Sequence, residues 1–335
     1  MDTQGEPLVE VWRGAFLESQ HSGHAAVWHA ESGLIAEWGD AREVILPRSS
    51  CKMMQALPLI ESGAADAAGL TEAQLALSCA SHQGARVHVG MVDAWLADLG
   101  LDDTALRCGS QWPADDAENR ALIHADGTPC QAHNNCSGKH AGFLTLSRHL
   151  GADPEYLDPG HPVQIAIKSA FEEVTGDPSP GYAIDGCSAP NHACSVAALA
   201  RGAAQFAAAK AGTVRGDAMI RLRNAMMAHP HLVAGETRAC TNLMRAMGTK
   251  AAIKTGAEAV FLAIVPEHRI GVAVKIADGA TRASEAVISQ LLVGLGVLDP
   301  EDPTGLLYRH GPIRNRRDIE TGAFRLTDTL TRWTL

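Results

Sequence analysis

A serine and a lysine with the spacing of a nucleophile and its base occur at the start of an apolar segment. The stretch 46–63 reads LPRSSCKMMQALPLIESG and contains Ser49 and Lys52 as an S-x-x-K pair. If the segment is a helix, Ser49 or Ser50 is a suitable N-cap, and Ser49 and Lys52 share one face. Burial disfavours the charged form of a lysine, and a neutral amine can accept a hydroxyl proton. The spacing predicts a Ser-Lys nucleophile pair, although an N-cap serine and a surface-reaching lysine would give the same tetrapeptide.

A second lysine motif, Lys254-Thr255-Gly256, stands directly before an apolar strand pattern. An S-x-x-K at a helix start together with a K-T-G at a sheet edge is typical of serine β-lactamases and penicillin-binding proteins. Those enzymes also carry an S-D-N triplet, which is absent from this chain. Ser81, in the stretch LSCASHQG, could supply the missing hydroxyl. The pattern there predicts either a loop that exposes Ser81 and His82 or an ordinary helix end.

Two cysteine-containing stretches could form a metal site. HNNCSGKHAGFL (133–144) contains Cys136, Lys139 and His140, and AIDGCSAPNHA (183–193) contains Asp185 and Cys187. Two separated cysteines with a nearby lysine or histidine could bind Zn²⁺, although a lysine must be neutral to act as a ligand. Buried, unreactive thiols are the alternative. Further possible ligands are His133, His140 and His192.

The elements that must position these residues follow from the hydrophobic periodicity. Strand patterns lie near both ends of the chain, at 7–14, 24–30, 33–39, 258–266 and 269–278, and the last two read as an antiparallel hairpin. Helical patterns fill the middle, at 71–80, 86–99, 140–150, 161–175, 195–211 and 215–228, and another follows at 281–296.

This order of elements predicts an α+β protein. One antiparallel sheet would form from the N- and C-terminal strands, be flanked by helices, and stand beside an inserted, mainly helical region. We therefore expect residues 1–335 to be a single catalytic unit, with a sheet region at 1–45 plus 250–335 and a mainly helical region at 46–249. The polar stretch 299–335 is expected to wrap the surface.

Composition excludes several classes of partner. The net charge is −10, and no basic run is long enough to bind nucleic acid. No apolar run approaches the roughly 18 residues that a membrane helix needs. The N-terminal sequence lacks a basic start followed by an apolar core, so no signal peptide is expected. The eight cysteines are irregularly spaced, which favours reduced thiols or metal ligands in a cytoplasmic protein.

Six motif blocks together resemble one enzyme family. In chain order they are RSSCKMMQALPL, CASHQG, NCSGKHAGFL, DGCSAP, HPHLVAGETRACTNLMRA and KTGAEAVFLAI. The sequence resembles the rhizobial, or type III, L-asparaginases over about residues 46–278. The resemblance implies a fold similar to serine β-lactamases and glutaminases, a homodimer, and hydrolysis of L-asparagine to L-aspartate and ammonia.

The resemblance also implies roles for individual residues. Ser49 matches the family nucleophile and Lys52 its base, while Ser81 and Lys254 match a second Ser-Lys pair. The positions that match residues near the substrate are Arg48, Asp185 and His140. Those that match the zinc ligands, with water as the fourth, are Cys136, Lys139 and Cys187. The chain departs from the family pattern at Met53, where a proline is common, and in the residues after Cys187.

Three alternatives share some of these features. A glutaminase would differ in the substrate by one methylene, which is worth only about 1–3 kcal/mol of discrimination. A β-lactamase or peptidase would need an export signal and the S-D-N triplet. A non-catalytic zinc-binding protein would need the metal ligands but neither Ser-Lys pair.

Overall fold

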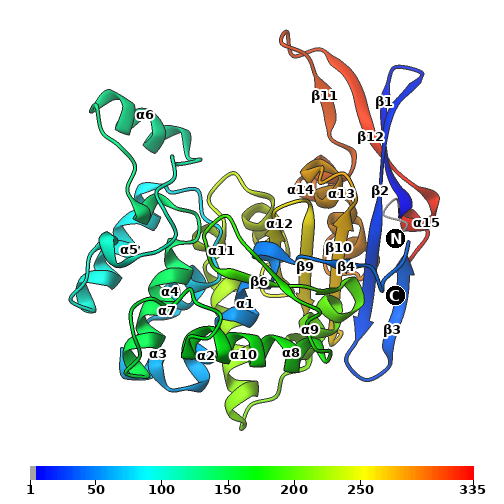
Figure 1. Cartoon of the computed structure of the whole chain (residues 1–335). Coiled ribbons are helices and arrows are strands. Elements are labelled where there is room, and N and C mark those ends of the chain that lie inside the picture. Colours follow the sequence, from blue (N-terminus) through cyan, green and yellow to red (C-terminus); the bar gives the residue numbers. More distant parts are fainter. Residues whose placement is uncertain (1–4) are drawn as a thin grey trace. The chain divides into compact units, whose positions relative to one another are not determined.

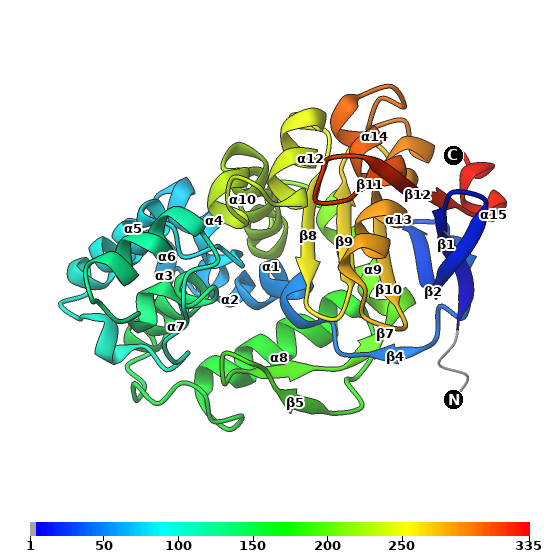
Figure 2. The same ribbon diagram turned by 90° about the horizontal axis from the view of Figure 1, so that it is seen from above.

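The computed structural model describes residues 5–335, and these divide into two compact units. The sheet unit comprises residues 5–50, 194–208 and 242–335, and the helical unit comprises residues 51–193 and 209–241. Figures 1 and 2 label their elements. The chain first passes from the sheet unit to the helical unit between Ser50 and Cys51, inside the S-x-x-K tetrapeptide. That residues 1–335 act as a single catalytic unit stays a prediction.

The sheet unit is built on one antiparallel sheet to which both ends of the chain contribute. Its strands follow the order β11-β12-β1-β2-β10-β9-β8, and β3 also pairs with β2. This arrangement confirms the expected α+β class with a sheet formed from N- and C-terminal strands. The strands are β1 Glu6–Arg13, β2 Phe16–His29, β3 Gly33–Trp38, β8 Ala252–Gly256, β9 Val260–Val265, β10 Ile270–Ile276, β11 Pro312–Arg314 and β12 Glu320–Leu326.

The centre of the sheet is its most buried part. β9 and β10 form the predicted antiparallel hairpin, with Val265 opposite Ile270. All residues of β9 are buried, as are all of β10 except Lys275, as expected for strands covered on both faces. Helices α9 (Val196–Ala208) and α13 (Thr281–Gly294) pack against this pair. Gly271 allows the closest approach, because a Cβ there would lie 2.1 Å from the carbonyl oxygen of Ala200.

The C-terminal stretch differs from the expectation that 299–335 wraps the surface. It forms α14 (Pro303–His310), β11, β12 and α15 (Asp328–Thr331), and β12 pairs with β1 as part of the main sheet. The sequence gives little sign of this, because β12 is mostly partly exposed and lacks the apolar alternation of a half-buried strand. Strand β2 also begins earlier than the predicted 24–30. Its first half is largely exposed, so the hydrophobic pattern did not reveal it.

Three short segments of the sheet unit, β4 (Val44–Ile45), β7 (Cys194–Ser195) and η1 (Arg48–Cys51), lie close in the chain or by pairing to the S-x-x-K tetrapeptide. Strand β4 pairs with β7, and the chain then enters the 3-10 turn η1. The last helix of this region, α12 (Ala239–Met247), begins in the helical unit and continues into the sheet unit.

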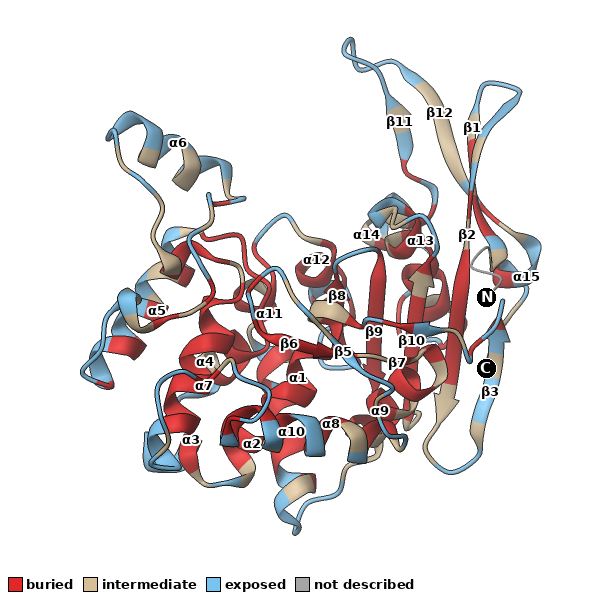
Figure 3. Cartoon of the chain, viewed as in Figure 1, coloured by how far each residue is buried: buried red, intermediate tan, exposed pale blue. Residues whose placement is uncertain are grey.

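The helical unit packs short and medium helices around a buried centre formed largely by α1, α4 and α7 (Figure 3). The helices predicted at 71–80, 86–99, 140–150, 161–175 and 215–228 are confirmed. The elements are α1 Lys52–Gln55, α2 Leu57–Glu61, α3 Ala64–Ala67, α4 Glu72–Ser78, α5 Arg86–Asp98, α6 Asp116–His124, α7 Ser137–His149, α8 Pro162–Thr175, α10 Val214–Ala228, α11 Pro230–Val233, the 3-10 turns η2 Asp103–Ala105 and η3 Gln131–His133, and strands β5 Tyr182–Ile184 and β6 Pro190–His192. Within residues 5–335, no helix has the length and apolarity needed to cross a membrane.

Candidate active site

Lys52 is the centre of a buried polar cluster in the helical unit. It is the first residue of α1, and its side chain is fully buried. Its Nζ donates hydrogen bonds to the carbonyl oxygen of Ala80, to Ser81 Oγ at 3.1 Å and to Cys136 Sγ at 3.1 Å. Three segments distant in sequence therefore meet at one amine. The lysine is not a surface-reaching side chain, so that alternative for the S-x-x-K tetrapeptide is wrong.

The serines before Lys52 lie in a 3-10 turn and do not cap α1. The N-cap residue is Cys51, which makes no side-chain capping bond, so the predicted serine cap is wrong. Ser50 instead donates its hydroxyl to the carbonyl oxygen of Pro47 at 2.7 Å, and its backbone N–H bonds to the same oxygen. Arg48 has a φ of 52°, a left-handed conformation uncommon for a residue with a side chain. Such backbone strain is often found at functional sites.

The K-T-G motif lies against this turn within the sheet unit. Lys254, Thr255 and Gly256 end strand β8, and Lys254 is fully buried with its Nζ donating to the carbonyl oxygen of Thr255 at 2.7 Å. A Cβ at Gly256 would lie 2.6 Å from the oxygen of Pro47 and 3.0 Å from the nitrogen of Ser50. The glycine therefore lets the end of β8 approach the backbone of the serine turn.

Ser81 and His82 lie in the irregular segment after α4, but they are not exposed. Their exposed fractions are 8% and 2%, so the prediction of a loop that exposes them is wrong. The reason is that two other segments cover the loop: the N–H of Ser81 bonds to the carbonyl oxygen of Val233, and the N–H of His82 bonds to that of Asn135.

The His82 ring is held by an ordered chain of hydrogen bonds. The N–H of Gly84 donates to His82 Nδ1, so in the neutral ring Nε2 carries the proton and donates to Ser137 Oγ at 2.9 Å. His82 also stacks on His88, with ring centroids 4.7 Å apart. Burial, followed by the neighbouring positive charges, lowers the pKa of His82 well below its usual value, and burial lowers the pKa of His88. Both rings therefore bind a proton less readily in the folded protein than in the unfolded chain.

We expect this histidine pair to make stability sensitive to acid. Below about pH 6.5 the unfolded chain binds protons that the folded rings do not, so the free energy of unfolding should fall by up to about 1.4 kcal/mol per pH unit for each histidine. Above that pH the effect should vanish. His88→Gln should reduce the slope measured by urea unfolding between pH 7.5 and pH 5.0, whereas the exposed His124→Gln should not. A wild-type slope in His88→Gln would contradict the assignment.

Cys136, Lys139 and Cys187 form a second part of the same cluster. All three are buried, and Lys139 Nζ donates to Cys187 Sγ at 3.2 Å. The Cys136 thiol donates to Asn135 Oδ1 at 2.9 Å while it accepts from Lys52. The proposed zinc ligands therefore adjoin the amine that contacts Ser81.

Electrostatics favour one thiolate in this group. The neighbouring Cys136 thiol lowers the pKa of Cys187, and Lys139 and His140 lower it further against the effect of burial. The interaction with Cys187, together with burial, raises the pKa of Cys136. Burial alone would lower the pKa of Lys139, but Cys187 and Cys136 raise it. Lys139 and Cys187 thus resemble a buried ion pair.

His140 completes the cluster from the same helix as Lys139. It is fully buried, and its Nδ1 bonds to Tyr156 Oη at 2.9 Å. The Tyr156 oxygen also accepts from the backbone N–H of Arg107. Burial lowers the pKa of His140 to about 4, while its interaction with the Cys187 sulfur opposes this effect. The ring is therefore neutral and lies against the Cys187 sulfur.

Asp185 lies at the edge of the loop that carries Cys187. Its backbone N–H bonds to the carbonyl oxygen of Ala189, and its carbonyl oxygen accepts from Ser188, which has a φ of 69°. This tight turn after β5 leaves Asp185 half-buried while Cys187 is buried. The turn therefore leaves the Asp185 carboxylate partly accessible and encloses the Cys187 sulfur.

The donor atoms present fit zinc. Two cysteine sulfurs and one lysine nitrogen do not form a common zinc ligand set. Each of these atoms can bind zinc when it is deprotonated. Two ligands on a tetrahedral zinc lie about 3.5 Å apart when bond lengths are about 2.0–2.3 Å, and the Lys139–Cys187 separation of 3.2 Å is close to this. Among residues 5–335, no group of three or more Cys, His, Asp and Glu side chains could hold a metal ion, so a site here requires the lysine.

Sequence analysis missed two residues that position the cluster. Asn135 accepts the Cys136 thiol and contributes the carbonyl oxygen that binds His82. Asn135 directly precedes Cys136 in the stretch HNNCSGKHAGFL, so its place next to a predicted zinc ligand could have indicated its role. Tyr156 orients His140, and it lies in no motif, so nothing in the sequence pointed to it.

Comparisons with known proteins give one match across most of the chain. A sequence model of the family described as L-asparaginase II matches residues 9–326. No curated protein matches significantly. Among solved structures, one described as Mglu in its native form has 14% sequence identity and a TM-score of 0.44, and the alignment covers 84% of this chain and 66% of that one. A β-lactamase from Mycobacterium bovis has 14% identity and a TM-score of 0.39, with 81% and 93% covered.

Proposed function

The chain belongs to the L-asparaginase II family, and from this premise we propose that it hydrolyses L-asparagine to L-aspartate and ammonia through a Ser-Lys nucleophile. Family membership makes the protein an amidohydrolase of the asparaginase type and confirms the resemblance inferred from the six sequence blocks. The observation that supports the Ser-Lys chemistry is the buried amine of Lys52, three residues after Ser49, whose Nζ also lies 3.1 Å from the hydroxyl of the second candidate serine, Ser81.

In the proposed reaction, Ser49 attacks the side-chain amide carbon of asparagine. Lys52 is the proposed base that accepts the hydroxyl proton. Backbone N–H groups beside the serine stabilise the oxyanion of the tetrahedral intermediate. Ser81, with Lys254, passes a proton to the leaving nitrogen, the C–N bond breaks, and ammonia departs. Water then attacks the ester and gives a proton back to Ser81, the bond from the acyl carbon to Ser49 breaks as Lys52 returns its proton to the serine, and aspartate is released.

Removing the nucleophile should abolish turnover. We expect Ser49→Ala to lower kcat/KM for L-asparagine at least about a thousandfold, measured as ammonia release, because no other group would form the ester. Ser81→Ala should lose about 10²–10⁴-fold, the usual contribution of a proton-transfer group. Near-normal turnover in folded Ser49→Ala, with loss only in Ser81→Ala, would transfer the nucleophile role to Ser81, the serine that contacts Lys52. No ammonia from the wild type would overturn the proposed function.

L-Glutamine is the competing substrate and serves as the comparison in the same assay. One additional methylene is worth about 1–3 kcal/mol in transition-state binding, or about 10–200-fold in kcat/KM. We propose asparagine as the preferred substrate, as family membership implies. The residues proposed to bind it are Arg48, Asp185 and His140. Faster turnover of glutamine than of asparagine would make the protein a glutaminase.

We propose that Cys136, Lys139 and Cys187 hold one zinc ion per chain. When bound, zinc would supply a Lewis acid that orients the substrate or Asp185. The chain's own residues would still provide the nucleophile. Loss of all turnover on chelation, with the fold intact, would contradict this division of roles and favour a metal-bound hydroxide as nucleophile.

The zinc proposal predicts a specific loss of metal. Cys187→Ser should reduce bound zinc from about one per chain to a small fraction, because one of two thiolate ligands is removed. Bound metal can be measured by mass spectrometry after dialysis at fixed free zinc. Cys194→Ser removes another buried thiol that is not in the cluster and should retain the metal. Equal zinc content in both variants, or none in the wild type, would contradict the site.

We further propose a cytoplasmic homodimer. The free state of all eight cysteines supports a reducing compartment. The dimer rests on the resemblance to rhizobial asparaginases and can be tested by light scattering of the purified chain.

A further inference from the structure

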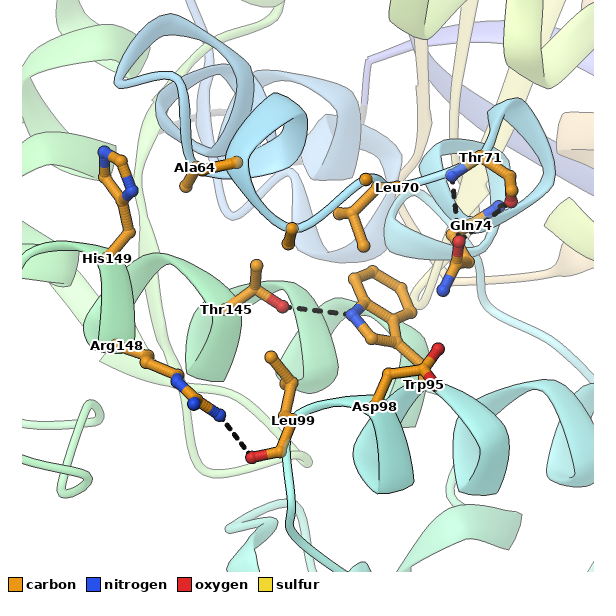
Figure 4. A pocket seen from close by; sticks show the side chains of 13 residues that line it. Ala64, Leu70, Thr71, Gln74, Trp95, Asp98, Leu99, Thr145, Arg148 and His149 are labelled. Atoms are coloured by element: carbon orange, nitrogen blue, oxygen red, sulfur yellow. Dashed lines mark hydrogen bonds between the residues drawn. The ribbon is translucent and has the colours of Figure 1, made fainter.

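Tyr156 and His140 form a buried hydrogen-bonded pair beside the proposed zinc ligands. Both side chains are 0% exposed, and Tyr156 Oη lies 2.9 Å from His140 Nδ1. The pair belongs to the helical unit, with His140 on α7 and Tyr156 in the loop between α7 and α8. A cavity of about 540 Å³ lies further along α7, but neither ring lines it (Figure 4). The partners of both rings are therefore protein atoms.

The hydrogen bonds of the tyrosine decide which ring nitrogen of His140 carries the proton. The backbone N–H of Arg107 donates to Tyr156 Oη at 2.8 Å, and among residues 5–335 the hydroxyl has one other partner, His140 Nδ1. The phenol proton is therefore donated to Nδ1, because the opposite arrangement would leave this buried donor without an acceptor. Nδ1 is then unprotonated, and in a neutral imidazole the proton lies on the other nitrogen, Nε2.

Tyr156 is itself held firmly by its surroundings. Its ring packs edge-on against Phe143, with centroids 5.8 Å apart, and against His140, with centroids 5.5 Å apart. Arg107, whose N–H binds the hydroxyl, also donates from its side-chain Nε to Glu155 Oε1 at 2.9 Å. That bond joins the segment before α6 to the residue next to the tyrosine. A hydroxyl fixed in this way can set the orientation of the ring that it contacts.

The other side of the His140 ring lies at the proposed zinc ligands. Nε2 makes no hydrogen bond to a nitrogen or oxygen atom of residues 5–335, and the ring lies against the Cys187 sulfur, with which it interacts. A protonated Nε2 cannot bind a metal ion, because the proton occupies the lone pair that the metal would need. It can donate a hydrogen bond to a thiolate.

We propose that Tyr156 is a positioning residue that fixes His140 with its proton on Nε2, so that the ring donates a hydrogen bond to the Cys187 sulfur and is not a zinc ligand. Loss of such a partner of a ligating atom typically costs about 10–100-fold in metal affinity. The consequence for zinc rests on the zinc site proposed above, whereas the position of the proton does not. An N–H at Nε2 also suits the substrate-binding role proposed for His140, because a substrate oxygen can accept from it.

The position of the proton can be measured without zinc or substrate. The full chain is labelled with nitrogen-15 histidine, and a proton–nitrogen correlation spectrum distinguishes protonated from unprotonated ring nitrogens. His140→Gln identifies the signals of His140 by their disappearance. At about pH 7.5 we expect a protonated Nε2 and an unprotonated Nδ1, both without zinc and with it. A proton on Nδ1, or metal coordination by Nε2 in the zinc-bound chain, would overturn the proposal.

Tyr156→Phe tests the role of the hydroxyl, and Tyr182→Phe, on the exposed strand β5 of the same unit, is its control. Tyr156→Phe removes the donor to Nδ1, so the Nδ1 resonance should move toward that of an imidazole nitrogen without a hydrogen bond. The Kd for zinc, measured by competition with a chelating dye, should rise about tenfold. Tyr182→Phe should change neither quantity. An unchanged Nδ1 resonance in folded Tyr156→Phe would overturn the assignment of the hydroxyl.

Two substitutions of His140 separate a donor at Nε2 from a purely structural role. The amide N–H of a glutamine can reach the place of Nε2, whereas the amide of an asparagine lies nearer the place of Nδ1. His140→Gln should therefore keep the Kd for zinc within about threefold of the wild type, and His140→Asn should raise it about tenfold or more. Equal losses in the two folded variants would overturn the donor role. A wild type that binds no zinc would contradict the zinc site, and the metal-free spectra would still support or overturn the position of the proton.

Discussion

Lys52→Met is expected to lower kcat/KM for L-asparagine by about a thousandfold or more. The methionine nearly preserves the volume of the side chain but removes the amine that contacts Ser81 Oγ and Cys136 Sγ. A positioned proton acceptor contributes typically about 10²–10⁴-fold. In this variant the nucleophile would have no base, and Ser81 would lose the hydrogen bond from Lys52. The measurement is ammonia release under saturating and limiting asparagine.

The stability of Lys52→Met separates catalysis from folding. The carbonyl oxygen of Ala80 loses the Lys52 donor, which costs about 1–3 kcal/mol if the oxygen is left unpaired. Removing a buried amine relieves part of its desolvation cost, so the variant should remain folded. Lys168→Met, on the exposed face of α8, is the control and should keep full activity. Retention of more than about a tenth of the wild-type activity in Lys52→Met would contradict the role of base.

Gly138→Ala is expected to have the largest effect on stability. Gly138 lies on α7 next to Lys139, and a Cβ there would be 2.4 Å from the carbonyl oxygen of Leu77 and 2.6 Å from Leu77 Cγ. A backbone carbonyl in α4 cannot move aside as a flexible side chain can. Overpacking of a core usually costs about 1–3 kcal/mol and sometimes more. We expect a loss of about 3 kcal/mol or more in the free energy of unfolding.

Gly142→Ala is the matched control, one turn further along the same helix. A Cβ there would lie 3.3 Å from Leu59 Cδ2, a side-chain atom that can shift slightly. The gain in helix propensity, about 1 kcal/mol, offsets that contact, so the net change should stay within about 1 kcal/mol. Urea unfolding of both variants at one zinc concentration tests the comparison. Similar losses of stability in the two variants would contradict the claim that the packing of α7 against α4 requires a glycine at position 138.

If α7 shifts in Gly138→Ala, the geometry of the polar cluster should also change. Cys136 precedes this helix, and Lys139 and His140 lie within it. Displacement by even about 1 Å can cost about a hundredfold in rate. We therefore expect reduced zinc content and reduced activity in Gly138→Ala, but not in Gly142→Ala.

Local sequence patterns were sufficient for most of the secondary structure. The hairpin β9–β10 was predictable because both strands are continuous apolar runs separated by a short loop. Helices α5, α8 and α10 agree with their predicted ranges to within a residue. The two strand errors have one physical cause. Strand β12 and the first half of β2 are partly exposed, and they depend on pairing with neighbouring strands more than on burial of their own side chains.

The sequence by itself determined which residue types were available for chemistry, together with the family and the α+β class. Motif order carried this information, because six blocks in one order are far more specific than any tetrapeptide. The tertiary structure alone decided which partners meet. Lys52 contacts Ser81 and Cys136, 29 and 84 residues away, and Lys139 contacts Cys187, 48 residues away. Such contacts depend on how α1, α4 and α7 pack, and side-chain packing over these separations leaves no periodic signal in the chain.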